Sequence, residues 1–190
     1  MQADFAVELG ADDPTLEIPW AAEDGGPRYW DLKHHPELIA NLEEVTRVPE
    51  LGDFLARVNS PTSALESAKC DVWPSVEINP EEEIFESPHK FCSYVDLLFA
   101  TEAKHFSLPE HERLAKNLVE LLKRAPEISA AAEFLIRRCY FEDQAGIRDG
   151  FYITFYLFGY GKDEAQSQQR WTLALKLVQN AIRQLSADSS

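Results

Sequence analysis

Several features of membrane, secreted and metal-binding proteins are missing from this sequence of 190 residues. No apolar run approaches the roughly 18 residues that cross a bilayer, so we expect no membrane-spanning segment. The opening residues, MQADFAVELGADDP, have neither a basic region nor an apolar core, so we expect no secretory signal. The three cysteines are widely spaced, without a CxxC pair or a cysteine–histidine cluster. This spacing predicts unpaired thiols, no metal site and a cytoplasmic location.

Basic residues are scarce. The chain has 18 Lys and Arg against 33 Asp and Glu, which gives a net charge of −15. Nucleic-acid binding relies on cations that neutralise phosphates, so this balance argues against a DNA or RNA partner. It also disfavours an anionic membrane surface. The charge leaves two interpretations open, namely a basic protein partner or solubility alone.

Nucleotide-binding and hydrolase motifs are also missing. The stretch GFYITFYLFGYGKDEA, residues 150–165, has the local order of a phosphate loop, in which a strand, glycines and a helix start follow one another. It lacks the GxxxxGK[ST] and GxGxxG spacings, and Asp163 and Glu164 would repel a phosphate. We therefore expect no cofactor, and a tight turn in which Gly159 and Gly161 adopt positive φ. No Gly-x-Ser-x-Gly elbow is present, and the sequence leaves open whether the protein is an enzyme.

Turn residues and periodicity predict the organisation of the chain. Residues 1–27 are acidic and rich in Gly and Pro, which indicates an irregular N-terminal arm with at most one short strand near 16–20. Residues 28–190 are predicted to form a single α+β domain. Its expected fold is an antiparallel sheet of about four strands, packed by helices, with a long C-terminal helix.

The expected elements follow from apolar spacing. The predicted helices are 36–47, 49–59, 107–125 and 162–186, and the predicted strands are 72–78, 91–100, 132–141 and 151–159. Pro74 should place the first of these strands at a sheet edge. The C-terminal helix has an apolar stripe formed by Trp171, Leu175, Val178, Ile182 and Leu185.

The strand at 151–159 alternates between two kinds of side chain. Its odd positions are apolar, whereas its even positions include Tyr152, Thr154 and Tyr156. Residues 133–141 are the natural hairpin partner, since they are next in sequence. If Phe141 pairs near Phe151, Arg138 lies on the even face and Arg137 on the odd face. A register slip of one residue exchanges the two arginines.

A buried arginine needs a carboxylate partner. We expect at least one of Arg137 and Arg138 to be buried, with Asp96 as the first choice of partner. The loop 79–90 is rich in glutamate, and its Glu82 is expected to be solvated.

The candidate site combines an arginine with tyrosines and comprises Arg138, Tyr140, Tyr152, Tyr156 and Asp96. One interpretation is a ligand site, because arginine binds carboxylates bidentately and tyrosines offer flat walls with hydroxyl donors. The other is a structural layer of cation–π contacts and hydrogen bonds beneath a helix.

Two functional hypotheses follow. The first is a non-enzymatic interaction protein, which either self-associates as a homodimer through its aromatic surface or binds a basic protein partner. The second is an enzyme or sensor for a small molecule.

The charge balance generates a first prediction. The protein should leave duplex DNA and RNA unshifted in a gel-shift assay at moderate salt, because −15 opposes phosphate contact. A basic DNA-binding protein in the same assay is the positive control. Tight retention that weakens as salt rises would contradict the expectation.

Overall fold

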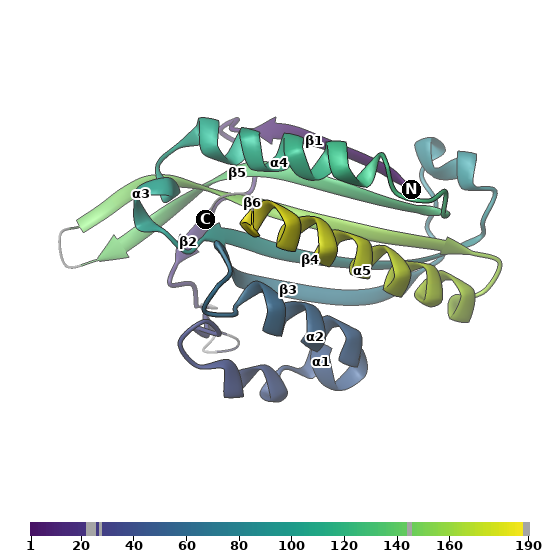
Figure 1. Cartoon of the computed structure of the whole chain (residues 1–190), viewed down its shortest axis with the longest axis horizontal. Coiled ribbons are helices and arrows are strands. Elements are labelled where there is room, and N and C mark those ends of the chain that lie inside the picture. The colour runs from purple at the N-terminus through teal and green to yellow at the C-terminus, as the bar shows by residue number, and fades with distance from the viewer. Residues whose placement is uncertain (22–25, 27, 144–145, 188–190) are drawn as a thin grey trace.

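A computed structural model describes residues 1–21, 26, 28–143 and 146–187 of the chain. These residues form a six-stranded sheet with helices packed against it (Figure 1). In chain order the elements are β1 (Gln2–Glu8), β2 (Leu16–Ile18), the 3₁₀ helix η1 (Pro36–Asn41), α1 (Glu43–Arg47), α2 (Pro49–Val58), β3 (Leu65–Ser75), the 3₁₀ helix η2 (Pro80–Phe85), β4 (His89–Phe99), α3 (Glu102–His105), α4 (Leu108–Leu122), β5 (Ala130–Asp143), β6 (Gly146–Gly161) and α5 (Glu164–Ala187).

The sheet is mixed. Its order is β1-β5-β6-β4-β3, with β2 also paired to β5. The neighbours β5–β6, β6–β4 and β4–β3 are antiparallel, whereas β1 and β2 run parallel to β5. The α+β class and the long C-terminal helix are confirmed, but the expectation of a purely antiparallel sheet of about four strands is wrong. The additional strands lie within residues 1–27, and the division of the chain into an arm and a domain stays a prediction.

The strand β1 escaped prediction because its partner is distant in sequence. Gln2 pairs with Ala131 and Glu8 with Arg137. Ala3 is buried, and Phe5 packs against the core. Only these two side chains of the strand join the core, so its sequence gives a weak signal of apolar and polar alternation.

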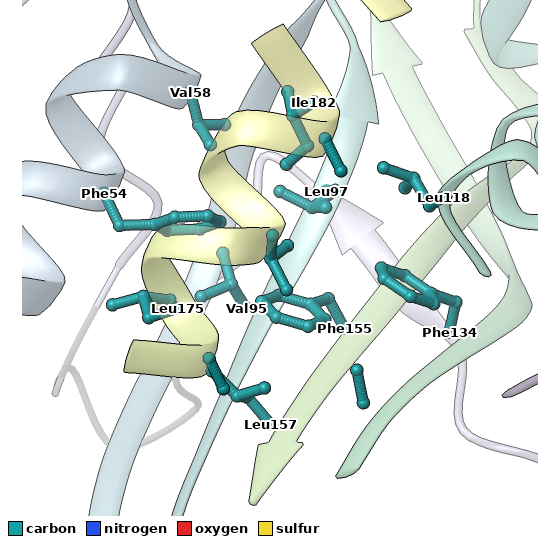
Figure 2. Close-up of a cluster of buried hydrophobic side chains, with 14 of the residues drawn as sticks. Phe54, Val58, Val95, Leu97, Leu118, Phe134, Phe155, Leu157, Leu175 and Ile182 are labelled. Carbon is teal, nitrogen blue, oxygen red and sulfur yellow. The ribbon is translucent and has the colours of Figure 1, made fainter. Parts of the chain in front are cut away.

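One face of the sheet, called here the first face, carries the helices and the main core (Figure 1). Figure 2 shows side chains from the helices and the strands meeting there, and the labelled residues are Phe54, Val58, Val95, Leu97, Leu118, Phe134, Phe155, Leu157, Leu175 and Ile182. The odd positions of β6 lie on this face, as the alternation predicts, and Ile153, Phe155 and Leu157 are buried. None of the helices in the described ranges is long and apolar enough to cross a membrane.

The hairpin of β5 and β6 has a different register from the expected one. Phe141 pairs with Arg148 rather than near Phe151, because both strands continue through residues predicted as a polar loop. The shift of three residues, from 151 to 148, is odd, so it exchanges the faces of alternate side chains. Arg137 therefore pairs with Tyr152, and Arg138 pairs with Phe151.

The strand β3 lies at the edge of the sheet and contains Pro74, which confirms the edge prediction. It begins at Leu65, several residues before the predicted start. A bulge between Ser67 and Lys69 interrupts its pairing with β4. The bulge interrupts the alternation of inward and outward side chains in the first half of β3, so this half is hard to recognise from sequence.

The helix α5 lies very close to β6. Trp171 and Val178 of its predicted stripe are fully buried, and Leu175 and Ile182 nearly so. At Gly159 a Cβ atom would collide with the backbone of Ser167 and Trp171. Among the described glycines only Gly146 has positive φ. The predicted positive-φ turn at Gly159 and Gly161 is therefore wrong, and Gly159 instead permits the close approach of α5 to the sheet.

This close approach predicts that Gly159→Ala destabilises the protein by at least about 2–3 kcal/mol, because the obstructing atoms are backbone and cannot move aside cheaply. Urea denaturation followed by circular dichroism measures the change. Gly10→Ala is the matched control, since its Cβ would meet only the flexible side chain of Asp13. Equal unfolding midpoints for Gly159→Ala and the wild type would refute the packing argument.

Candidate functional site

The face of the sheet opposite the helices is called here the second face, and described segments of the chain cover its two ends. At one end Leu16 and Trp20 of the N-terminal segment pack with Leu98 and Tyr152. At the other end η2 places Phe85 flat against Tyr160, with ring centroids 4.0 Å apart. The centre of the face between these covers carries partly exposed side chains.

A row of aromatic rings crosses this centre and is called here the aromatic strip. It consists of Trp73, Tyr94, Tyr156 and Phe158, all partly exposed. Successive ring centroids are 6.3, 5.9 and 6.2 Å apart. Tyr94 and Tyr156 are direct cross-strand partners, and such pairs stabilise a sheet. The strip therefore has a rigid base and an open upper surface.

A buried polar network lies beside the strip. The Nε of Arg137 donates to Oε2 of Glu8 at 2.8 Å, and its Nη1 donates to Oγ1 of Thr154 at 3.2 Å. The Thr154 hydroxyl donates to Oδ1 of Asp96 at 2.8 Å. The guanidinium carbon also lies 5.8 Å from the centroid of the Tyr156 ring. The network thus links four strands, namely β1, β5, β6 and β4.

The structure brings together three of the five predicted site residues. Asp96, Tyr152 and Tyr156 lie on the second face. Arg138 and Tyr140 project from the opposite side of β5 and are exposed. Whether these residues form a ligand site stays a prediction.

Arg137 takes the place expected for Arg138, because the register differs by an odd number of residues. The prediction of a buried arginine paired to a carboxylate is confirmed for Arg137, which is 9% exposed. Its carboxylate partner is Glu8 rather than Asp96, which it reaches only through Thr154.

Two members of the network escaped prediction. Thr154 stands out in the sequence as the one small polar residue within an apolar run. Its hydrogen bonds could not be predicted without knowing which strands lie beside β6. Glu8 had no local signal, since it meets Arg137 only through the parallel pairing of β1 with β5.

Burial controls the ionisation of Asp96. The residue is 5% exposed, and burial raises the pKa of its carboxyl group to about 6 from an ordinary value of 3.8. The hydrogen bond from Thr154 and the charges of Lys69 and Arg137 act in the opposite direction but do not cancel the effect. Asp96 is therefore the titrating group of this network in the weakly acid range.

Two phenols of the second face, those of Tyr94 and Tyr152, have raised pKa values and are protonated at neutral pH. Burial raises the pKa of Tyr152 to about 12, and the charge of Asp96 adds to the effect. Burial, followed by Asp96 and Asp71, likewise raises the pKa of Tyr94. Because both hydroxyls keep their protons, they are available as hydrogen-bond donors.

Carboxylates border the strip on its β1 and β5 side. They are Asp4, Glu8 and Glu133, called here the acidic rim; Asp4 pairs with Glu133, and Glu8 lies four residues farther along β1, opposite Arg137. The pKa of Glu133 is raised, first by burial and then by the charges of Glu82, Asp4 and Glu8. The charge of Lys90 opposes this shift without reversing it. The rim is therefore a region of incompletely compensated negative charge.

The 3₁₀ helix η2 is anchored by an ion pair that the sequence did not predict. Nζ of Lys90 lies 2.9 Å from Oε2 of Glu82, and the Tyr160 hydroxyl donates to Oε1 of Glu82 at 2.7 Å. Burial favours the neutral acid, but the backbone N–H of Asn79, Tyr160 and Lys90 together lower the pKa of Glu82. The expectation that Glu82 is solvated is wrong, since its side chain is only 12% exposed.

Two histidines lie at the junction of β4 with α3 and α4. The Nε2 of His105 is 2.6 Å from the carbonyl oxygen of Phe99, and Nδ1 of His111 is 2.9 Å from that of Ser107. Burial lowers the pKa of both imidazoles, which favours their neutral forms. Among the described residues no group of three or more His, Cys, Asp or Glu side chains is arranged to hold a metal ion.

All three cysteines are free thiols, as expected. Cys92 and Cys139 are buried and Cys70 is partly exposed, and burial raises the pKa of each to about 12. Such thiols are poor nucleophiles.

Comparison with known proteins adds no assignment, since no family model, curated protein or solved structure matches this chain. The chemistry of the second face must be judged from its own residues.

The buried carboxyl group generates a prediction about pH. The folded-state pKa of Asp96, about 6, exceeds its ordinary value of 3.8, so the folded protein binds the extra proton between these values. Its contribution to stability is complete below about pH 4 and is lost as pH rises through about 6, by about 3 kcal/mol in all. Asp96→Asn keeps the acceptor for Thr154 and removes the titration.

Urea melts at several pH values between about 4 and 7.5 test this expectation. The free energy of unfolding of Asp96→Asn, relative to the wild type, should increase by about 2–3 kcal/mol over this range. Asp53→Asn, at an exposed position of α2, is the control and should show no such trend. A constant difference between Asp96→Asn and the wild type would show that folding does not raise the pKa of Asp96.

Proposed function

We propose that the protein is a non-enzymatic binding protein whose second face binds a basic, partly apolar segment of a protein partner. One observation carries the proposal. The chain covers both ends of this face with its own segments and leaves the aromatic strip between them partly exposed.

The composition of the strip favours an interface. A solvent-facing sheet surface is usually polar, whereas a covered one is apolar. The strip is intermediate, with a tryptophan, two tyrosines and a phenylalanine above a buried arginine. Tyrosine, tryptophan and arginine are the residues most enriched at the energetic centres of protein interfaces.

The polar network supports the same conclusion. Arg137, Thr154 and Asp96 are buried, and a buried ionic group contributes little net stability compared with a packed apolar one. Such a network holds the tyrosine rings and their hydroxyls in place before a partner arrives. Preorganisation of this kind lowers the entropic cost of binding.

Charge determines the kind of partner. The acidic rim lies along one side of the strip, and the chain as a whole carries −15. A segment with Lys or Arg beside apolar residues complements this surface in charge and accelerates its own association. A second copy of the chain would bring two acidic rims together, so we favour a different protein over a homodimer. Unpaired, unreactive thiols are consistent with a cytoplasmic protein.

Peptide selection tests this function. Peptides selected from a random display library on the wild-type protein should be enriched in Lys and Arg together with apolar residues, and their affinity should fall as salt rises. Tyr156→Ala should weaken a selected peptide at least about tenfold by calorimetry, the loss expected when an interface anchor is truncated. Tyr140→Ala is the matched control, because Tyr140 is an exposed tyrosine on the other side of β5.

The proposal is wrong if the selected peptides lack basic residues or if Tyr156→Ala binds them as tightly as Tyr140→Ala does. Sedimentation of the unliganded protein provides a separate readout. A dimer that Tyr156→Ala dissociates would establish self-association in place of a basic partner.

A further inference from the structure

A groove of about 710 Å³ lies beside the edge strand β3, outside the aromatic strip apart from a shared border at Tyr94. This volume is within the range of small-molecule sites, about 300–1,000 Å³. Segments far apart in sequence form its walls, and the lining residues include Trp20, Trp30, Leu42, Glu44, Lys69 and Cys70.

Specific contacts attach two walls of the groove to β3. The indole Nε1 of Trp20 donates to the carbonyl oxygen of Ala68 at 2.8 Å, which fixes the aromatic wall against β3. Arg47 at the end of α1 lies 3.2 Å from Asp71 of β3 and so fixes the opposite wall. Because each wall is tied to the same strand, the groove is a preformed feature of the fold.

The groove combines aromatic and acidic groups. Its lining residues include Trp20 and Trp30 as well as Glu43 and Glu44. At its floor, burial raises the pKa of Cys70, and the charges of Glu44 and Asp71 raise it further. Negative charge from Glu44 and Asp71 therefore reaches Cys70 in the lining of the groove.

The Trp20 ring already accepts a cation. The Nζ of Lys69 lies 5.2 Å from the ring centroid, within the distance of a cation–π contact. Lys69 is exposed at the protein surface, so its ammonium group can move into water when another cation takes its place. Arg28 also lines the groove. Of these two cations, Lys69 is the one observed in contact with the Trp20 ring.

We propose that this groove is a binding site for a small organic amine, with the apolar body of the ligand against Trp30 and Leu42. The ligand ammonium replaces that of Lys69 over the Trp20 ring and is balanced by Glu44. The site is independent of the proposed partner-binding function, because Glu44 and Lys69 do not belong to the aromatic strip.

Two probes of opposite charge test the site, namely phenylethylamine, which is an ammonium ion at neutral pH, and phenylpropionate. Ligand-observed NMR and calorimetry on the full chain should show millimolar or tighter binding of the amine and at least about tenfold weaker binding of the carboxylate. Glu44→Gln should weaken the amine about tenfold. Lys69→Ala should tighten it severalfold, because the Trp20 ring is then vacant.

Glu120→Gln, at an exposed position of α4, is the control and should bind the amine like the wild type. Denaturation midpoints verify that each variant is folded. If Glu44→Gln is unstable, Trp30→Leu replaces it in the test and should also weaken binding of the amine. The proposal is overturned if phenylpropionate binds as tightly as phenylethylamine, if neither probe binds at millimolar concentration, or if Lys69→Ala weakens the amine.

Discussion

The register of the β5–β6 hairpin is the constraint on which the rest of the structure depends. It pairs Ile136 with Ile153 and Arg137 with Tyr152, so that apolar side chains lie under the helices and polar ones lie opposite. A slip of one residue would bring Arg137 into the helix-covered core, where no carboxylate is available from Glu8. An unpaired buried guanidinium is strongly destabilising, so the ion pair and the apolar contacts select the same register.

The two faces differ in how the chain completes them. The central part of the first face is covered by α2, α4 and α5 and is filled mainly by apolar side chains. The second face is completed by short segments at its ends, and it satisfies its buried polar groups through cross-strand hydrogen bonds. The edge of β3 is protected in a related way, because side chains from elsewhere bind its backbone. The indole of Trp20 and the ammonium group of Lys33 each donate to carbonyl groups there.

Local patterns predicted those parts of the fold that depend on one segment. The stripe of α5 and the alternation of β6 each repeat over several turns or residues. Both ends of α5 were predicted within two residues, whereas β6 begins at Gly146, five residues before its predicted start. The strand β1 and the early start of β3 were missed. Their recognition requires a partner strand, which lies about 129 residues away for β1.

The same distinction applies to the candidate site. Asp96, Tyr152 and Tyr156 were predicted from their own strands, whereas the choice between Arg137 and Arg138 required the length of the hairpin turn. Polar residues at 142–150 resembled a loop, yet most of them continue the two strands beyond the core. No property of the Glu8 segment indicated that it would neutralise an arginine from the other end of the chain.

The parallel pairing of β1 with β5 also orders the events of folding. During synthesis β1 precedes its partner β5, which appears only after β3, β4 and four α-helices have been made. Until then Ala3 and Phe5 lack the core residues against which they pack, and Glu8 lacks its partner Arg137. Pairing at such long separation is slow, because the entropy of closing the loop is lost before any contact compensates for it. The edge strand β1 is thus synthesised well before the strand that it pairs with, and it is among the last able to find its place.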